Sequence, residues 1–240
     1  MQSLENKRVL VIGGSSGIGL ATAKLATEAR ARVTIASRDN GRLDDAVKKL
    51  GARADARVLD ATNQSAVDAF FKADSSWDHV VCSAGAGGRG FLPDLAMDKA
   101  FAAMDAKFWA YFRIARAVQL PPDGSLTFVS GQLSQIPSRG ATLVSAINAA
   151  IEGMTRGLAL DLAPTRVNTI CPGVIDTPLW DQLPPDAKKA LYAKQAATLL
   201  TGNIGQPEDV AEAILSAMTN HFMTGTTMML EGGAGLLSGY

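Results

Sequence analysis

The chain has 240 residues, of which 47% are hydrophobic and 19% charged, enough to bury the core of one α/β domain spanning residues 1–240. Lysine plus arginine and aspartate plus glutamate each number 23, which argues against nucleic acid or an anionic membrane as partner and favours a small-molecule substrate. The start of the chain has no secretion-signal pattern and no apolar stretch is long enough to span a membrane, so we expect a cytoplasmic protein.

Short β-branched runs alternate with longer helical patterns along the chain. We expect seven strands, at Arg8–Ile12, Val33–Ala36, Arg57–Leu59, His79–Cys82, Ser125–Ser130, Val167–Cys171 and Thr226–Leu230. Helical periodicity lies between them, at Gly17–Ala29, Leu43–Leu50, Gln64–Lys72, Lys99–Val118, Leu143–Ala163 and Pro207–Ser216. This alternation predicts a Rossmann-type, doubly wound, seven-stranded parallel sheet flanked by helices. Ligands of such sheets bind beyond the carboxyl ends of the strands.

The loop between the first strand and the first helix is rich in glycine, and it reads Gly13, Gly14, Ser15, Ser16, Gly17, Ile18, Gly19. Glycine lets the backbone turn sharply and approach a pyrophosphate, and the amide groups at the start of a helix attract phosphate charge. A loop of this kind between a strand and a helix predicts a dinucleotide site. The alternative is a tight turn without a ligand.

The second strand ends with Ser37 and Arg38, where an NAD-binding domain ordinarily has an acidic residue for the ribose hydroxyls. A guanidinium group instead suits a 2′-phosphate in both charge and geometry. We therefore predict NADP(H) as the cofactor, in preference to NAD(H). In the alternative interpretation, Arg38 is a solvated surface charge and Asp39 reaches back to the ribose.

The longest irregular stretch covers residues 176–207, where Pro178, Pro184 and Pro185 interrupt a weakly helical pattern that includes residues 187–200. A stretch of this length inside a compact domain is typical of a substrate lid. We expect Trp180, within it, either to cover a substrate or to fix the lid to the body of the protein.

The order and spacing of several motifs resemble the short-chain dehydrogenase/reductase family over nearly the whole chain. The glycine loop is similar to that family's Thr-Gly-x3-Gly-x-Gly motif, with Ile12 in place of Thr, and residues 82–85 resemble its Asn-Asn-Ala-Gly. Asp60 follows the third strand where the resemblance implies a bond to the adenine amino group, and residues 172–177 resemble the nicotinamide-binding segment. The residues expected to bind the cofactor are Gly13, Ser15, Ser16, Gly17, Ile18, Gly19, Ser37, Arg38, Asp60, Ala61, Ser83, Ala84, Gly85, Asn148, Pro172, Gly173, Ile175 and Thr177. The sequence predicts no metal site.

The catalytic pattern of the family is altered. Its members use a Tyr as proton donor, a Lys four residues later and a Ser, whereas the resemblance aligns Val144 with the Tyr and Asn148 with the Lys. The strict register aligns Gly131 with the Ser and leaves Ser130 one residue earlier. The family's helix Asn falls near Asp105, and Lys107 lies half a turn beyond it.

Candidate catalytic residues are therefore Ser130 and Lys107. We expect Lys107 or Asp105 to line the cleft; the alternative for Lys107 is a solvated or ion-paired helix charge. Asn148 can still bond the nicotinamide ribose through its amide. The loss of a general acid slows ketone reduction by roughly 10²–10⁴-fold, so we hypothesise either a relocated acid or an acceptor, such as an iminium, that needs no proton.

Two functions follow from these patterns. The first is an NADP(H)-dependent oxidoreductase of the short-chain dehydrogenase/reductase type with an atypical catalytic site. The alternative is an NADP(H)-binding protein without redox turnover, either a cofactor sensor or a non-redox catalyst that uses the cofactor as a scaffold. The segment Lys99–Val118 carries more apolar surface than one sheet-facing stripe needs, and in the family this helix packs across a two-fold axis, which implies a homodimer or homotetramer.

Overall fold

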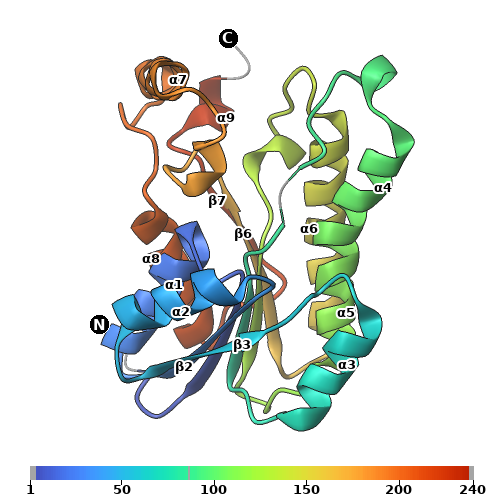
Figure 1. Ribbon diagram of the computed structural model, residues 1–240, viewed down its shortest axis with the longest axis vertical. Coiled ribbons are helices and arrows are strands. Elements are labelled where there is room, and N and C mark those ends of the chain that lie inside the picture. The colour runs from blue at the N-terminus through green and yellow to red at the C-terminus, as the bar shows by residue number, and fades with distance from the viewer. Residues whose placement is uncertain (1–3, 86, 238–240) are drawn as a thin grey trace.

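The computed structural model describes residues 4–85 and 87–237, which form a parallel sheet between two layers of helices (Figure 1). The strand order is β3-β2-β1-β4-β5-β6-β7 and every adjacent pair is parallel. The bounds of the strands are β1 Arg8–Ile12, β2 Arg32–Ser37, β3 Ala54–Val58, β4 His79–Cys82, β5 Ser125–Val129, β6 Arg166–Pro172 and β7 Thr227–Leu230. The expected doubly wound sheet of seven strands is confirmed.

The helices divide between the two faces of the sheet. Their bounds are α1 Gly17–Glu28, α2 Asn40–Leu50, α3 Gln64–Ala73, α4 Met97–Met104, α5 Ala110–Ala117, α6 Thr142–Asp161, α7 Pro185–Thr198, α8 Pro207–Thr219 and α9 Ala234–Leu237. In Figure 1, α1, α2 and α8 lie on one side of the sheet and α3 to α6 on the other. The single-turn elements are η1 Leu92–Asp94, η3 Gln132–Ser134 and η4 Pro178–Trp180.

Alternation along the strands builds two cores. In β1, Leu10 and Ile12 face the core that α3 to α6 cover, whereas Val9 and Val11 face the core under α1, α2 and α8. Successive side chains of a strand point to opposite faces, and burial on both faces explains why the central strands are apolar throughout.

Two expected elements differ in their extent. The strand expected at residues 57–59 begins three residues earlier, at Ala54, because β3 pairs with β2 along residues that lack β-branched side chains. The helix expected at residues 99–118 contains a π-helical turn, η2 Asp105–Trp109, between α4 and α5. Such turns insert one residue into a helix and so rotate the side chains that follow.

Residues 176–207 are more ordered than the proline pattern predicts. Pro178 and Pro185 stand at the first position of η4 and α7, where the missing proline amide costs nothing, so they begin helices rather than interrupt one. The prediction of an irregular stretch was therefore wrong in part.

The order of the strands creates a crevice at the carboxyl ends of β1 and β4. From β1 the chain proceeds outward through β2 and β3, and from β4 it proceeds the other way, so that the two loops after β1 and β4 diverge. This switch point is where open α/β sheets bind ligands. Among the helices that the structure describes, none has the length and apolarity to cross a membrane.

Candidate active site

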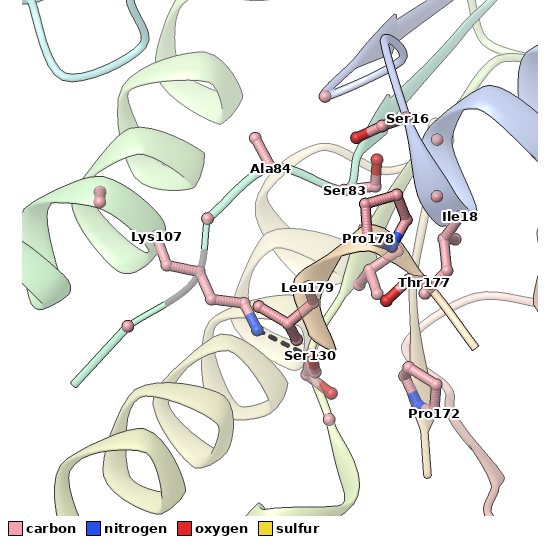
Figure 2. Close-up of a pocket in the computed structure, with 18 of the residues that line it drawn as sticks. Ser16, Ile18, Ser83, Ala84, Lys107, Ser130, Pro172, Thr177, Pro178 and Leu179 are labelled. Atoms are coloured by element: carbon pink, nitrogen blue, oxygen red, sulfur yellow. Dashed lines mark hydrogen bonds between the residues drawn. The ribbon is translucent and has the colours of Figure 1, made fainter. Parts of the chain in front are cut away.

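A cleft of about 750 Å³ lies at this switch point. It brings together all the residues expected to bind the cofactor and both candidate catalytic residues, Ser130 and Lys107. Figure 2 shows the Lys107 side chain reaching across the pocket to Ser130, with Ser16 and Ile18 at the start of α1 on the far side.

The glycine loop forms an open cradle at the start of α1. Gly13 has a φ of 85°, and a Cβ there would stand 2.6 Å from the backbone nitrogen of Ala84, so only glycine fits. Ser16 caps α1 without a side-chain hydrogen bond, and no acidic residue occupies the first turn. The helix therefore presents its amide groups and positive dipole to the cleft, which fits a pyrophosphate.

Two arginines line the cleft beyond β2. Arg38 is exposed at its edge, and Arg42, which sequence reasoning missed, lies one turn further along. The carboxylate of Asp39 accepts a hydrogen bond from the Arg42 amide at 3.0 Å and lies 3.5 Å from its guanidinium group. Asp39 is therefore engaged as the cap of α2.

Asp60 is held at the cleft by Thr62, a second residue that sequence reasoning missed. One carboxylate oxygen accepts hydrogen bonds from the Thr62 hydroxyl at 2.7 Å and the Thr62 amide at 3.0 Å. These bonds lower the pKa of Asp60, so the carboxylate is a charged acceptor at neutral pH.

Lys107 projects into the cleft from the π-helical turn. Its ammonium group donates to the carbonyl of Ser130 and to Oδ1 of Asn148, both at 2.8 Å. Its stem packs on Gly85, where a Cβ would stand 2.9 Å from that of Lys107. Burial lowers the pKa of Lys107 to about 8. The interpretation of Lys107 as a solvated or ion-paired charge was therefore wrong.

Asp105 does not line the cleft. It pairs instead with Arg113, at 2.6 Å, so of the two residues expected at the cleft only Lys107 lines it. Asp105 and Lys107 are two residues apart and therefore lie on opposite sides of the helix, so Lys107 faces the cleft while Asp105 pairs with Arg113 of α5.

Asn148 links Lys107 to the loop after β5. Its side chain is buried, its amide nitrogen donates to the Gly131 carbonyl at 3.1 Å, and its oxygen accepts from Lys107. Asn148 stands at the position where the family has its lysine. The Lys107 ammonium therefore lies beside that position, although Lys107 belongs to a different helical segment. Val144, one turn earlier in α6, lines the cleft with an apolar side chain.

Ser130 is 5% exposed and its hydroxyl donates to the carboxylate of Glu152 at 3.2 Å. Sequence reasoning missed Glu152. Spacing offered a signal, because residues 144, 148 and 152 are four apart and share one face of α6.

The segment 176–207 closes one side of the cleft. Its lining residues are Thr177, Pro178, Leu179, Trp180 and Gln182. The Trp180 indole donates to the Ile175 carbonyl at 2.9 Å, so this side chain both lines the cleft and is tied to the body. None of the residues of α7 is buried.

The sheet order and the cleft define a nucleotide-binding Rossmann domain. A family model described as an SDR-like Rossmann domain matches residues 1–237, and the chain belongs to the short-chain dehydrogenase/reductase family. It is 33% identical to the short-chain dehydrogenase/reductase ATR9 of Stachybotrys chlorohalonatus, over 98% of this chain and 99% of that protein.

Two solved structures are similar over nearly their full length. The MalC reductase/Diels-Alderase of Malbranchea aurantiaca is 30% identical with a TM-score of 0.89, over 97% of this chain and 98% of that one. An NADPH-bound short chain oxidoreductase of Pseudomonas aeruginosa PAO1, described as containing an atypical catalytic center, is 29% identical with a TM-score of 0.86. That match covers 95% of this chain and 98% of the other.

Proposed function

We propose that the protein is an NADP(H)-dependent oxidoreductase in which Lys107 replaces the family's tyrosine as proton donor. The observation that carries this proposal is the Lys107 ammonium in the cleft, 2.8 Å from the side chain of Asn148. A small molecule is the substrate, and residues 176–207 act as its lid.

The cofactor would be held along the cleft by groups suited to each of its parts. The start of α1 would bind the pyrophosphate, and Asp60 would bind the adenine. The segment Pro172–Thr177 would bind the nicotinamide end. Arg38, with Arg42 beside it, suits a 2′-phosphate, and the engagement of Asp39 as a helix cap favours this assignment. When bound, the nicotinamide supplies or accepts a hydride.

The proton is the part of the reaction that this chain must supply. An ammonium has three N–H donors, of which Ser130 and Asn148 engage two, so the third is available to a substrate oxygen. A pKa of about 8 suits proton transfer near neutral pH, since the acid is mostly charged yet releases its proton readily. Lys107 therefore serves both to orient a carbonyl oxygen and to protonate it.

The relatives bear on both candidate functions. The NADPH-bound Pseudomonas oxidoreductase favours redox use of the cofactor with an altered site. MalC is described as both a reductase and a Diels-Alderase, which supports a non-redox step in a relative but not the absence of redox turnover.

The test uses two acceptors of matched shape, a cyclic ketone and the corresponding preformed iminium, with NADPH oxidation followed by absorbance. If Lys107 is the acid, Lys107→Met lowers the rate of ketone reduction by roughly 10²-fold or more. The rate of iminium reduction stays the same, because an iminium needs no proton. Equal loss on both acceptors rejects Lys107 as the acid. NADPH binding without oxidation by a broad panel of acceptors supports the non-redox alternative.

The proposed assembly is a homodimer or homotetramer through the continuous segment of α4, η2 and α5. Phe101, Trp109 and Phe112 are 68%, 46% and 42% exposed, and Trp109 and Phe112 contact each other edge to face. Apolar side chains gathered in this way favour association with a second copy. A monomeric mass by light scattering at micromolar concentration contradicts this proposal. We also propose a cytoplasmic location, which fractionation with a tagged chain tests.

A further inference from the structure

A buried carboxylate lies directly behind the candidate active site. Glu152 stands one turn beyond Asn148 in α6 and is only 6% exposed, and it does not line the cleft. Acidic side chains are almost never buried to this extent unless another group compensates their charge.

The hydrogen bonds of Glu152 come from neutral donors and are long. Its Oε1 accepts from the Ser130 hydroxyl at 3.2 Å and from the Cys171 thiol at 3.6 Å. Its Oε2 accepts from the Gln135 amide at 3.5 Å. Long hydrogen bonds from neutral groups offset only part of the desolvation cost of a carboxylate. A nearby cation would offset more of this cost.

Lys107 lies on the other side of Ser130. The Ser130 carbonyl accepts from the Lys107 ammonium at 2.8 Å, while its hydroxyl donates to Glu152, so one residue bridges the two charges. Burial lowers the pKa of Lys107, and the charges of Cys171 and Glu152 act in the opposite direction. Burial also raises the pKa of the Cys171 thiol, which is therefore neutral near pH 7 and leaves Glu152 as the effective anion.

We propose that Glu152 is a positioning residue that maintains the charge of Lys107 and holds the Ser130 hydroxyl away from the substrate. Because that hydroxyl donates its proton to Glu152, it can only accept a hydrogen bond from the cleft side. A substrate carbonyl must then be protonated by Lys107 and not by Ser130. The relevance to catalysis rests on the proposed function, whereas the effect on Lys107 does not.

The experiment measures the charge of Lys107 without a substrate or cofactor. The protein is labelled with ¹³Cε-lysine, its lysine signals are titrated by NMR, and the Lys107 signal is assigned from its loss in Lys107→Met. Glu152→Gln keeps an acceptor for Ser130 but removes the charge, and it should move the Lys107 midpoint downward by about one pH unit. Glu212→Gln is the matched control, because Glu212 is exposed on α8, and it should leave the midpoint unchanged.

Two further variants cover the case in which Glu152→Gln does not fold. Glu152→Asp keeps the charge and should hold the Lys107 midpoint close to that of the unaltered protein, whereas Glu152→Ala should lower it. An unchanged midpoint in Glu152→Gln, or in Glu152→Ala, overturns the proposal.

The same variants separate this inference from the proposed function. If ketone reduction occurs, its decline toward high pH should begin about one pH unit lower in Glu152→Gln. If the protein binds NADPH but reduces nothing, the NMR shift still supports the coupling of Glu152 to Lys107 while the proposed function fails.

Discussion

Replacing Arg38 with alanine tests the choice of cofactor most directly. Charge-assisted hydrogen bonds contribute about 1.5–3 kcal/mol each, and the exposed position of Arg38 puts its contribution at the lower end because water and salt screen the charge. About 1.5 kcal/mol corresponds to roughly a tenfold rise in the Kd for NADPH. NADH lacks the 2′-phosphate, so its Kd should stay within about twofold.

Isothermal titration calorimetry with both nucleotides measures this difference. Arg42→Ala is the matched control, since the Arg42 guanidinium is shared with Asp39 and should contribute only about threefold. Raising the salt concentration should narrow the preference of the unaltered protein for NADPH. Equal weakening of NADPH and NADH by Arg38→Ala, or tighter binding of NADH by the unaltered protein, would refute the reasoning.

Three further predictions concern proton transfer, the cofactor cradle and stability. In single-turnover assays, ketone reduction should decline as the pH rises through about 8, the pKa of Lys107, because the acid loses its proton; Lys107→Met should remove this decline. Gly13→Ala should weaken NADPH binding at least tenfold by calorimetry, with an unchanged circular dichroism spectrum, because its Cβ would stand 2.6 Å from the Ala84 nitrogen. Burial lowers the pKa of His79 from 6.5 to about 4, so the unfolded chain takes up a proton first as the pH falls. Urea unfolding should show a loss of about 2 kcal/mol between pH 7 and pH 5, which His79→Gln should reduce.

Each of these has a contradicting result. A pH profile that is the same in Lys107→Met shows that another group donates the proton. Unaltered NADPH affinity in Gly13→Ala shows that the loop can move aside or is not the cofactor site. A stability that does not change between pH 7 and pH 5 shows that His79 takes up its proton equally in both states.

Local signals made most of the fold and the cofactor cleft predictable. Strand burial, helix periodicity and the glycine loop depend on neighbours in the sequence, which is why β1, β4 and the start of α1 match the expected residues. The start of β3 at Ala54 was missed because it depends on pairing with β2, a contact made across the chain.

The hydrogen bonds that join Lys107, Ser130 and Glu152 depend on tertiary contacts, so local sequence signals could not predict them. Spacing puts Glu152 on the same face of α6 as Val144 and Asn148, but its burial and its bond to Ser130 depend on how the loop after β5 packs on α6. Periodicity places Asp105 and Lys107 on opposite sides of the helix, but which of the two faces the cleft depends on how the helix packs against the rest of the protein.

The π-helical turn carries side chains that face in two opposite directions. Within the five residues Asp105–Trp109 it carries both the lysine that enters the cleft and an indole ring on the outer surface. A second copy docked against Trp109 would therefore press on the segment that aims the ammonium group. If the proposed assembly includes Trp109, the interface between copies and the candidate catalytic lysine share one short stretch of backbone.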